Sequence, residues 1–133
     1  GRLAVENPSV EICGFAEYEA LGNHYRWADV LCLPSWFDTY GLVIDEAMAF
    51  GVPFVATDRV GEVAERSATG AGDVVVAKSP SALAKALGAM FDEDRWTQGS
   101  AAAYAWTLDH GLDDWVEDLH RAAKALHRLQ VSR

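Results

Sequence analysis

The chain has 133 residues and half of them are hydrophobic, which suits one packed domain and excludes two domains with separate functions. Its 20 acidic and 11 basic residues give a formal net charge of -9, which argues against nucleic acid and anionic membranes as partners. No apolar run reaches the roughly 18 residues that span a bilayer. The N-terminus lacks a secretory pattern, so we predict no transmembrane segment and a cytoplasmic location.

Strand-like and helix-like runs alternate through the first part of the chain. Runs that are apolar almost throughout, as in parallel strands covered on both faces, span residues 10–14, 30–34, 53–57 and 73–77. Helical segments are predicted between them, over residues 18–28, 41–50 and 63–66. This alternation predicts a parallel α/β sheet with right-handed crossovers. Cys13 and Cys32 lie inside the first two runs, so we expect buried, reduced thiols.

After the last predicted strand the pattern indicates helices only, over about residues 79–129. Ser79 and Pro80 suit the N-cap and the first turn of the first helix. An apolar stripe then runs along this helix, formed by Leu83, Ala86, Leu87, Met90 and Phe91. A second helix is predicted from Asp94 towards Trp106, and a third, amphipathic helix over residues 112–129.

The predicted sheet is small. Its four strands compare with about five or six in a usual open α/β sheet. No repeat or flexible linker marks an internal boundary, and the chain opens at Gly1 without an initiator methionine. We therefore expect a single, partial domain over residues 1–133, whose first strands lie upstream of Gly1.

Residues 30–57 contain three charged side chains, and all of them are acidic: Asp38, Asp45 and Glu46. Asp38 falls in the loop after a strand, at the sheet edge where open α/β folds bind ligands. A helix starts next, and the first-turn amides of Gly41, Leu42 and Val43 suit a phosphate. Ionised acids accept hydrogen bonds from the hydroxyl pairs of sugars. The pattern favours a site for a nucleoside diphosphate sugar, with Asp38 and Glu46 facing one cavity.

Other roles fit the same residues. Asp38 also suits a cap for the helix that follows, and Glu46 also suits the positive end of the helix dipole. Asp45 is expected to be solvated or to favour the positive end of the helix dipole. Four apolar side chains of this segment are expected in the core, namely Leu42, Ile44, Met48 and Phe50.

A larger pattern includes these acids. Its residues are Pro34, Ser35, Asp38, Tyr40, Gly41, Leu42, Val43, Glu46, Ala47, Met48, Ala49, Gly51 and Pro53. In this register the stretch resembles the signature of the retaining GT-B glycosyltransferases of family 4, which have two Rossmann-like domains. The segments VEICGF and YRWADVLCLPS resemble the same family. The resemblance extends from about Val10 to Leu87.

The resemblance implies a Rossmann-like parallel sheet with flanking helices that binds a nucleotide-sugar donor. The first acid would contact hydroxyl groups of the transferred hexose, and the second acid those of the ribose. By position, the implied donor-binding residues are Asp38, Tyr40, Gly41, Leu42, Val43 and Glu46. Gly14 and Phe15 would lie near the nucleobase. No metal or other cofactor is implied.

The chain also departs from the family pattern. The first acid is usually Glu, and Asp38 is one methylene shorter. Gly61 is followed by Glu62 where the family has a pair of glycines. A basic Arg and Lys pair and a separate N-terminal domain, which binds the glycan, lipid or small-molecule acceptor, would lie upstream of Gly1. We therefore expect the catalytic residues there, and no turnover by these residues alone.

Two other functions remain open at this point. One is a nucleotide-sugar epimerase or phosphorylase of the same fold, and the other is a non-catalytic α/β module that binds a partner through its tail helix. Asp92, Glu93 and Asp94 have the spacing of some metal-nucleotide sites, but a charged helix end explains them better. The histidines have no ligand spacing typical of zinc, and the helical spacing of Trp96, Trp106 and Trp115 favours packing over ligand stacking.

Overall fold

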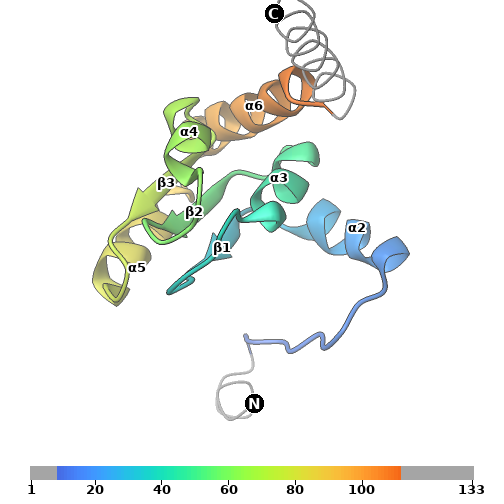
Figure 1. The fold of residues 1–133 in the computed structure, drawn as a ribbon, viewed down its shortest axis with the longest axis horizontal. Coiled ribbons are helices and arrows are strands. Elements are labelled where there is room, and N and C mark those ends of the chain that lie inside the picture. Colours follow the sequence, from blue (N-terminus) through green and yellow to red (C-terminus); the bar gives the residue numbers. More distant parts are fainter. Residues whose placement is uncertain (1–8, 112–133) are drawn as a thin grey trace, which may run out of the picture.

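The computed structural model describes residues 9–111 of the chain. Strands and helices alternate as predicted: α2 (Tyr18–Trp27), β1 (Leu31–Leu33), α3 (Leu42–Ala49), β2 (Phe54–Thr57), α4 (Val63–Ala68) and β3 (Gly72–Val75). Two consecutive helices follow, α5 (Pro80–Ala89) and α6 (Glu93–Asp109). Each of these elements lies within a few residues of its predicted position (Figure 1).

The three strands form one parallel sheet in the order β1-β2-β3. Leu31 pairs with Phe54 in β2, and Phe54 pairs with Gly72 in β3. Within residues 9–111, β1 pairs on one side only, so its outer edge is open. The predicted parallel α/β sheet is confirmed, with one strand fewer than expected among the described residues.

The core lies around β2, whose four residues are all buried. Ile44 and Met48 of α3 and Ala103 of α6 pack with Phe54 into one cluster. Helix α5 contacts β2 and β3, so helices flank the sheet (Figure 1). This is the predicted Rossmann-like arrangement, and the chain continues into helices after β3 as expected.

The helix predicted over residues 112–129 lies outside the described residues. Among the helices that the structure does describe, none has the length and apolar character that crossing a membrane requires.

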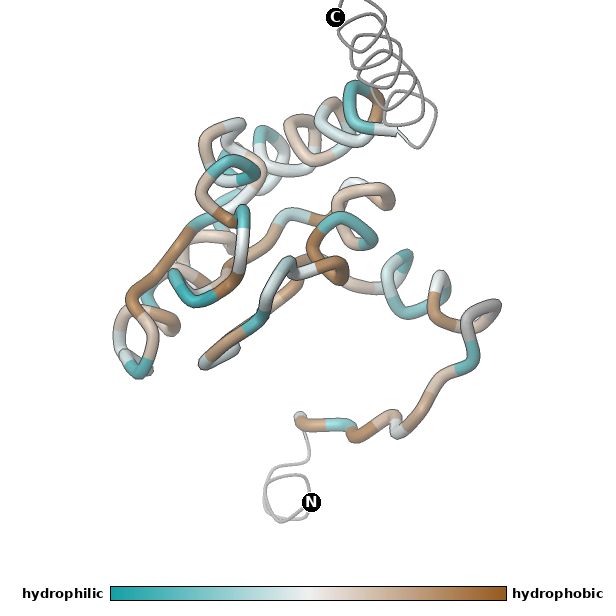
Figure 2. Tube along the Cα trace, in the orientation of Figure 1, coloured by the Kyte–Doolittle hydropathy of each residue, from teal (hydrophilic) through white to brown (hydrophobic). Residues whose placement is uncertain are grey.

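The strand predicted at residues 10–14 is wrong. This segment is extended but forms no strand, and it runs apart from the sheet as a largely apolar trace (Figures 1 and 2). Val10 is 42% exposed and Ile12 is 58% exposed. Their residue types favour a strand, but a strand needs a hydrogen-bonded neighbour, and residues 9–111 provide none here.

The cysteines are exposed, contrary to the prediction. Cys13 lies in the unpaired segment, and Cys32 lies in the edge strand β1. A thiol in a run of apolar residues is buried only where another element covers that run. Neither position is covered by another described element.

Two side chains predicted to lie in the core, Leu42 and Phe50, are also exposed, as is Phe91 of the predicted apolar stripe. Leu42 is 63% exposed because it begins α3 at the rim of the sheet, and Phe50 is 41% exposed because it follows the end of the same helix. Phe91 is 90% exposed because α5 ends at Ala89, before the apolar stripe does. The predictions for Ile44 and Met48 are confirmed, since both are fully buried.

Candidate functional site

Two loops lie side by side at the carboxyl edge of the sheet: the β1–α3 loop (residues 34–41) and the β2–α4 loop (residues 58–62). The Asp38 N–H donates to the carbonyl of Arg59 at 3.0 Å, and the Gly61 N–H donates to the carbonyl of Asp38 at 2.9 Å. A Cβ atom at Gly61 would collide with the Thr39 carbonyl, so glycine allows this close approach. The two loops therefore form one backbone unit.

The Asp38 carboxylate holds the loop that precedes α3. Its Oδ1 atom accepts hydrogen bonds from the N–H of Tyr40 at 3.0 Å and from the N–H of Gly41 at 2.8 Å. The N-cap residue of α3 is Gly41, and no side chain caps it, so the capping role considered for Asp38 is wrong. The Gly41 amide, expected to face a phosphate, is already bonded, whereas the amides of Leu42 and Val43 lie in the first turn, where a helix supplies no carbonyl partners.

Gly41 has the backbone conformation that the start of α3 requires. Its φ is 77°, in the left-handed region that side chains other than glycine rarely adopt. A Cβ atom at this position would also overlap Cγ1 of Val60, which is buried. Conformation and space therefore both restrict position 41, between Asp38 and the helix, to glycine.

Glu46 lines a different part of the surface. It faces a cavity of about 370 Å³ between α2 and α3, and the lining residues are Leu21, Gly22, Tyr25, Arg26, Glu46, Ala49 and Phe50. The Tyr25 hydroxyl donates to Glu46 Oε2 at 2.6 Å. Asp38 is not among the lining residues, so this cavity does not support the expectation that both acids face one cavity.

Tyr25 is a contact of the candidate site that sequence reasoning missed. Burial, followed by the hydrogen bond to Glu46, raises the pKa of its hydroxyl above the ordinary range. Its ring also stacks on Phe50 at a centroid distance of 5.6 Å. The hydroxyl is therefore protonated at neutral pH. It donates its hydrogen bond to the Glu46 carboxylate and so orients that carboxylate.

The remaining predicted site residues lie in two places. The exposed side chains of Tyr40, Leu42 and Val43 surround the start of α3 at the carboxyl edge. Gly14 and Phe15 lie in the extended segment before α2, which runs apart from the sheet (Figure 1). The structure does not bring this pair together with the start of α3.

Asp45 lies in the first turn of α3, as the dipole-favouring alternative expects, and its side chain is 31% exposed, but it also has a partner that was not predicted. Its two carboxylate oxygens accept hydrogen bonds from Nε and Nη2 of Arg66, at 2.6 and 2.7 Å. Arg66 is only 1% exposed. Burial by itself lowers the pKa of the guanidinium, but the Asp45 carboxylate outweighs this effect and the pKa is raised. The two residues form a permanent ion pair.

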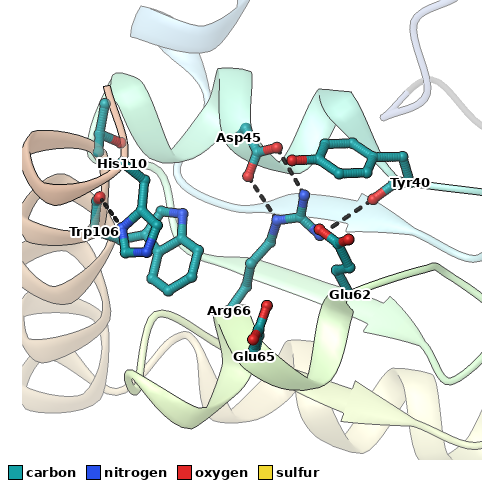
Figure 3. A pocket seen from close by; sticks show the side chains of 8 residues that line it. Tyr40, Asp45, Glu62, Glu65, Arg66, Trp106 and His110 are labelled. Carbon is teal, nitrogen blue, oxygen red and sulfur yellow. Dashed lines mark hydrogen bonds and ion pairs between the residues drawn. The ribbon is translucent and has the colours of Figure 1, made fainter. Parts of the chain in front are cut away.

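This ion pair borders a polar cavity of about 330 Å³. Figure 3 shows the Arg66 guanidinium between Asp45 and Tyr40, with Trp106 and His110 of the α6 end nearby. The cavity lining consists of Tyr40, Asp45, Glu62, Glu65, Arg66, Trp106, Thr107 and His110. Since Asp45 neutralises Arg66, this cation is not free for a diphosphate.

No metal site is found among residues 9–111, where no three His, Cys, Asp or Glu side chains are grouped so that they could hold an ion. Asp92 instead caps α6, because its Oδ1 accepts from the Arg95 N–H at 2.9 Å. The acidic run at 92–94 is therefore the start of a helix.

Comparisons with known proteins place this geometry in a family. Residues 2–93 match the family described as Glycosyl transferases group 1. D-inositol 3-phosphate glycosyltransferase of Streptomyces griseus subsp. griseus is 37% identical over 115 residues, which cover 83% of this chain and 24% of that protein. The protein of the same name from Corynebacterium urealyticum is 38% identical over 96 residues, which cover 66% of this chain and 22% of that protein.

A solved structure has the same fold. Sucrose-phosphate synthase from Thermosynechococcus elongatus matches with a TM-score of 0.70 at 24% identity, over 99% of this chain and 34% of that one. This chain spans about a quarter of the length of the curated relatives it matches. The family match covers well over half of the chain and agrees with the Rossmann-like sheet. The chain therefore belongs to the Glycosyl transferases group 1 family.

Proposed function

We propose that this domain binds the nucleotide-sugar donor of a retaining glycosyltransferase of family 4, which transfers a hexose to a glycan, lipid or small-molecule acceptor. The observation that carries the proposal is the placement of Asp38 beside the first turn of α3, at the carboxyl edge of a parallel sheet. Ligands of open α/β sheets bind at this edge. Membership of the glycosyltransferase family supports a sugar donor as the ligand.

The two acids suit opposite ends of such a donor. Asp38 precedes the first turn of α3, and Glu46 follows it one turn later on the side that faces α2. A diphosphate at the amides of Leu42 and Val43 would place the hexose towards Asp38 and the ribose towards Glu46. An extended ligand of this kind needs no single cavity shared by both acids.

Asp38 keeps a free acceptor atom for this role. The amides of Tyr40 and Gly41 both bind Oδ1, and Oδ2 accepts none of the hydrogen bonds found in the described part of the chain. An ionised carboxylate has lone pairs for about four hydrogen bonds. The two loop amides fix the orientation of the carboxylate, and Oδ2 then receives a hexose hydroxyl.

The rest of the reaction is assigned to other parts of the protein. The chain spans about a quarter of its curated relatives, so acceptor binding, the catalytic residues and the cations that neutralise the diphosphate belong to the remaining sequence. These 133 residues alone are expected to turn over no donor. The reaction is expected to need no metal, so EDTA should leave donor binding unchanged.

The test uses the full-length protein that contains this chain. Titration calorimetry with UDP- and GDP-sugars should show binding, which D38N and E46Q each weaken by about 1 to 3 kcal/mol through loss of a charged hydrogen bond. The matched control is D94N, an exposed acid in the first turn of α6 at another part of the surface. Unchanged affinity in both D38N and E46Q would refute the assignment of the two acids.

A simpler measurement tests the ligand class. A ligand that binds the native state raises the melting temperature, so UDP, GDP or one of their sugars should shift it in a thermal scan of the wild-type protein. No shift and no heat of binding with any of these nucleotides would refute donor binding itself.

A further inference from the structure

Arg66 occupies an unusual position for an arginine, because it is the largest side chain that the described residues bury completely. Its guanidinium contacts both loops of the carboxyl edge. Nη1 donates to the carbonyl of Tyr40 at 3.1 Å and to the carbonyl of Gly61 at 3.0 Å. The guanidinium carbon lies over the Tyr40 ring, 4.8 Å from the ring centroid (Figure 3).

We propose that Arg66 and Asp45 are positioning residues that set the conformation of the β1–α3 loop for donor binding, an inference that rests on the proposed function. Tyr40 directly precedes Gly41, and its own N–H is held by Asp38. The peptide groups between Asp38 and the first turn of α3 are therefore fixed from one side by a carboxylate and from the other by a guanidinium. Both the acid and the amides assigned to the donor depend on this segment.

The second loop is held by the same group. The carbonyl of Gly61 accepts a hydrogen bond from the Arg66 guanidinium, and the Gly61 N–H donates to the carbonyl of Asp38. Arg66 thus acts on Asp38 in two ways, through Tyr40 in its own loop and through Gly61 in the neighbouring loop. A shift of the guanidinium would therefore displace Tyr40 and Gly61 together, and both of them contact Asp38.

Asp45 explains why a charged side chain can lie there. A buried guanidinium without a partner is costly, and a carboxylate that binds it through two oxygens compensates the charge and fixes the plane of the group. Asp45 belongs to α3 itself, so the pair ties the helix to both loops. Lysine could not make these bonds at once, because its ammonium is a compact group without the planar fork of arginine.

A second arginine pair provides a matched control for stability. Arg95 Nη2 contacts Asp73 Oδ1 at 2.7 Å, and Arg95 Nη1 donates to the carbonyl of Gly70 at 3.2 Å. This pair also joins a carboxylate and a backbone carbonyl to one guanidinium. It lies at the start of β3, at the amino edge of the sheet, so it has no contact with either loop of the carboxyl edge.

The experiment compares R66K with R95K in the full-length protein. UDP- and GDP-sugar binding is titrated at a temperature at which each variant is folded, as judged by circular dichroism, and donor KM and kcat are measured separately. R66K is expected to weaken donor binding on the order of tenfold, below the roughly 10²-fold loss of rate that a misplacement of about 1 Å can cause. R95K is expected to lower the melting temperature and to leave the donor affinity within about twofold.

A double variant separates positioning from stability further. D45L/R66M removes the buried guanidinium and its half-buried carboxylate partner at once, and such replacements often restore the stability that a single removal loses. The carbonyls of Tyr40 and Gly61 nevertheless lose their donor. We expect D45L/R66M to be more stable than R66M alone and to retain the weakened donor binding.

The outcomes are distinct. If wild-type protein binds no nucleotide or nucleotide sugar, the proposed function itself fails. If wild-type protein binds the donor and R66K binds it as well as R95K does, the positioning role is overturned and the pair serves stability only. Normal donor affinity in D45L/R66M would overturn it too.

Discussion

The conformation of Gly41 leads to a quantitative prediction for the Gly41→Ala variant. A φ of 77° costs a side chain other than glycine roughly 1 to 2 kcal/mol. The added Cβ would overlap Cγ1 of Val60, which is only 4% exposed, and overpacking of a filled core adds about 1 to 3 kcal/mol. We therefore expect Gly41→Ala to lower the free energy of unfolding by roughly 2 to 5 kcal/mol.

The assay is urea denaturation followed by tryptophan fluorescence, with Gly70→Ala as the matched control. Gly70 has a φ of 90°, and a Cβ there meets no atom within 4 Å, so this variant carries the backbone cost alone. In a Val60→Ala background the overlap disappears, and the cost of Gly41→Ala should fall by about 1 to 3 kcal/mol. Equal costs of Gly41→Ala and Gly70→Ala would refute the steric part of the reasoning.

Further predictions concern the core, a helix cap and a buried hydroxyl. Phe54→Ala should lower the free energy of unfolding by about 3 to 5 kcal/mol in urea denaturation, because Phe54 is fully buried at the centre of the sheet. Asp92→Ala should cost about 1 kcal/mol in the same assay through loss of the α6 cap, with no dependence on added Mg²⁺. The raised pKa of Tyr25 means that the folded protein holds the phenol proton more tightly than the unfolded chain does. The resulting stability is present below the ordinary tyrosine pKa of about 10 and declines above it. Unfolding curves measured at increasing alkaline pH should show a smaller decline for Tyr25→Phe, and an unchanged slope would contradict the pKa raised by burial and by the hydrogen bond to Glu46.

Local patterns were enough to predict most of the fold. The apolar runs of β1, β2 and β3 are short and bounded by turn residues, and Ser79 with Pro80 marks the start of α5. The Ser79 hydroxyl does accept the N–H of Ala82, as an N-cap should. Such signals depend on neighbouring residues alone. The segment at 10–14 has the same local character, but a strand also needs a partner strand.

Long-range pairing limited the prediction of the candidate site. The Asp38 carboxylate bonds to residues two and three positions away, but it holds the loop before α3 and not the helix cap considered from the sequence. Asp45 and Arg66 are separated by 21 positions, and no spacing rule joins them. Tyr25 and Glu46 are also 21 positions apart. A charged residue in an apolar helix signals that a partner exists, but only the packed structure identifies it.

Among residues 9–111, β1 pairs on one side only, and its other side has a practical consequence for work with the isolated piece. Leu31, Cys32 and Leu33 carry no charge, and edge strands without charged residues are templates for pairing with another molecule. Concentrated preparations of these 133 residues should self-associate through that strand, and the exposed Cys32 can lock two copies together as an interchain disulfide in air. Reductant and dilution are thus conditions for handling it.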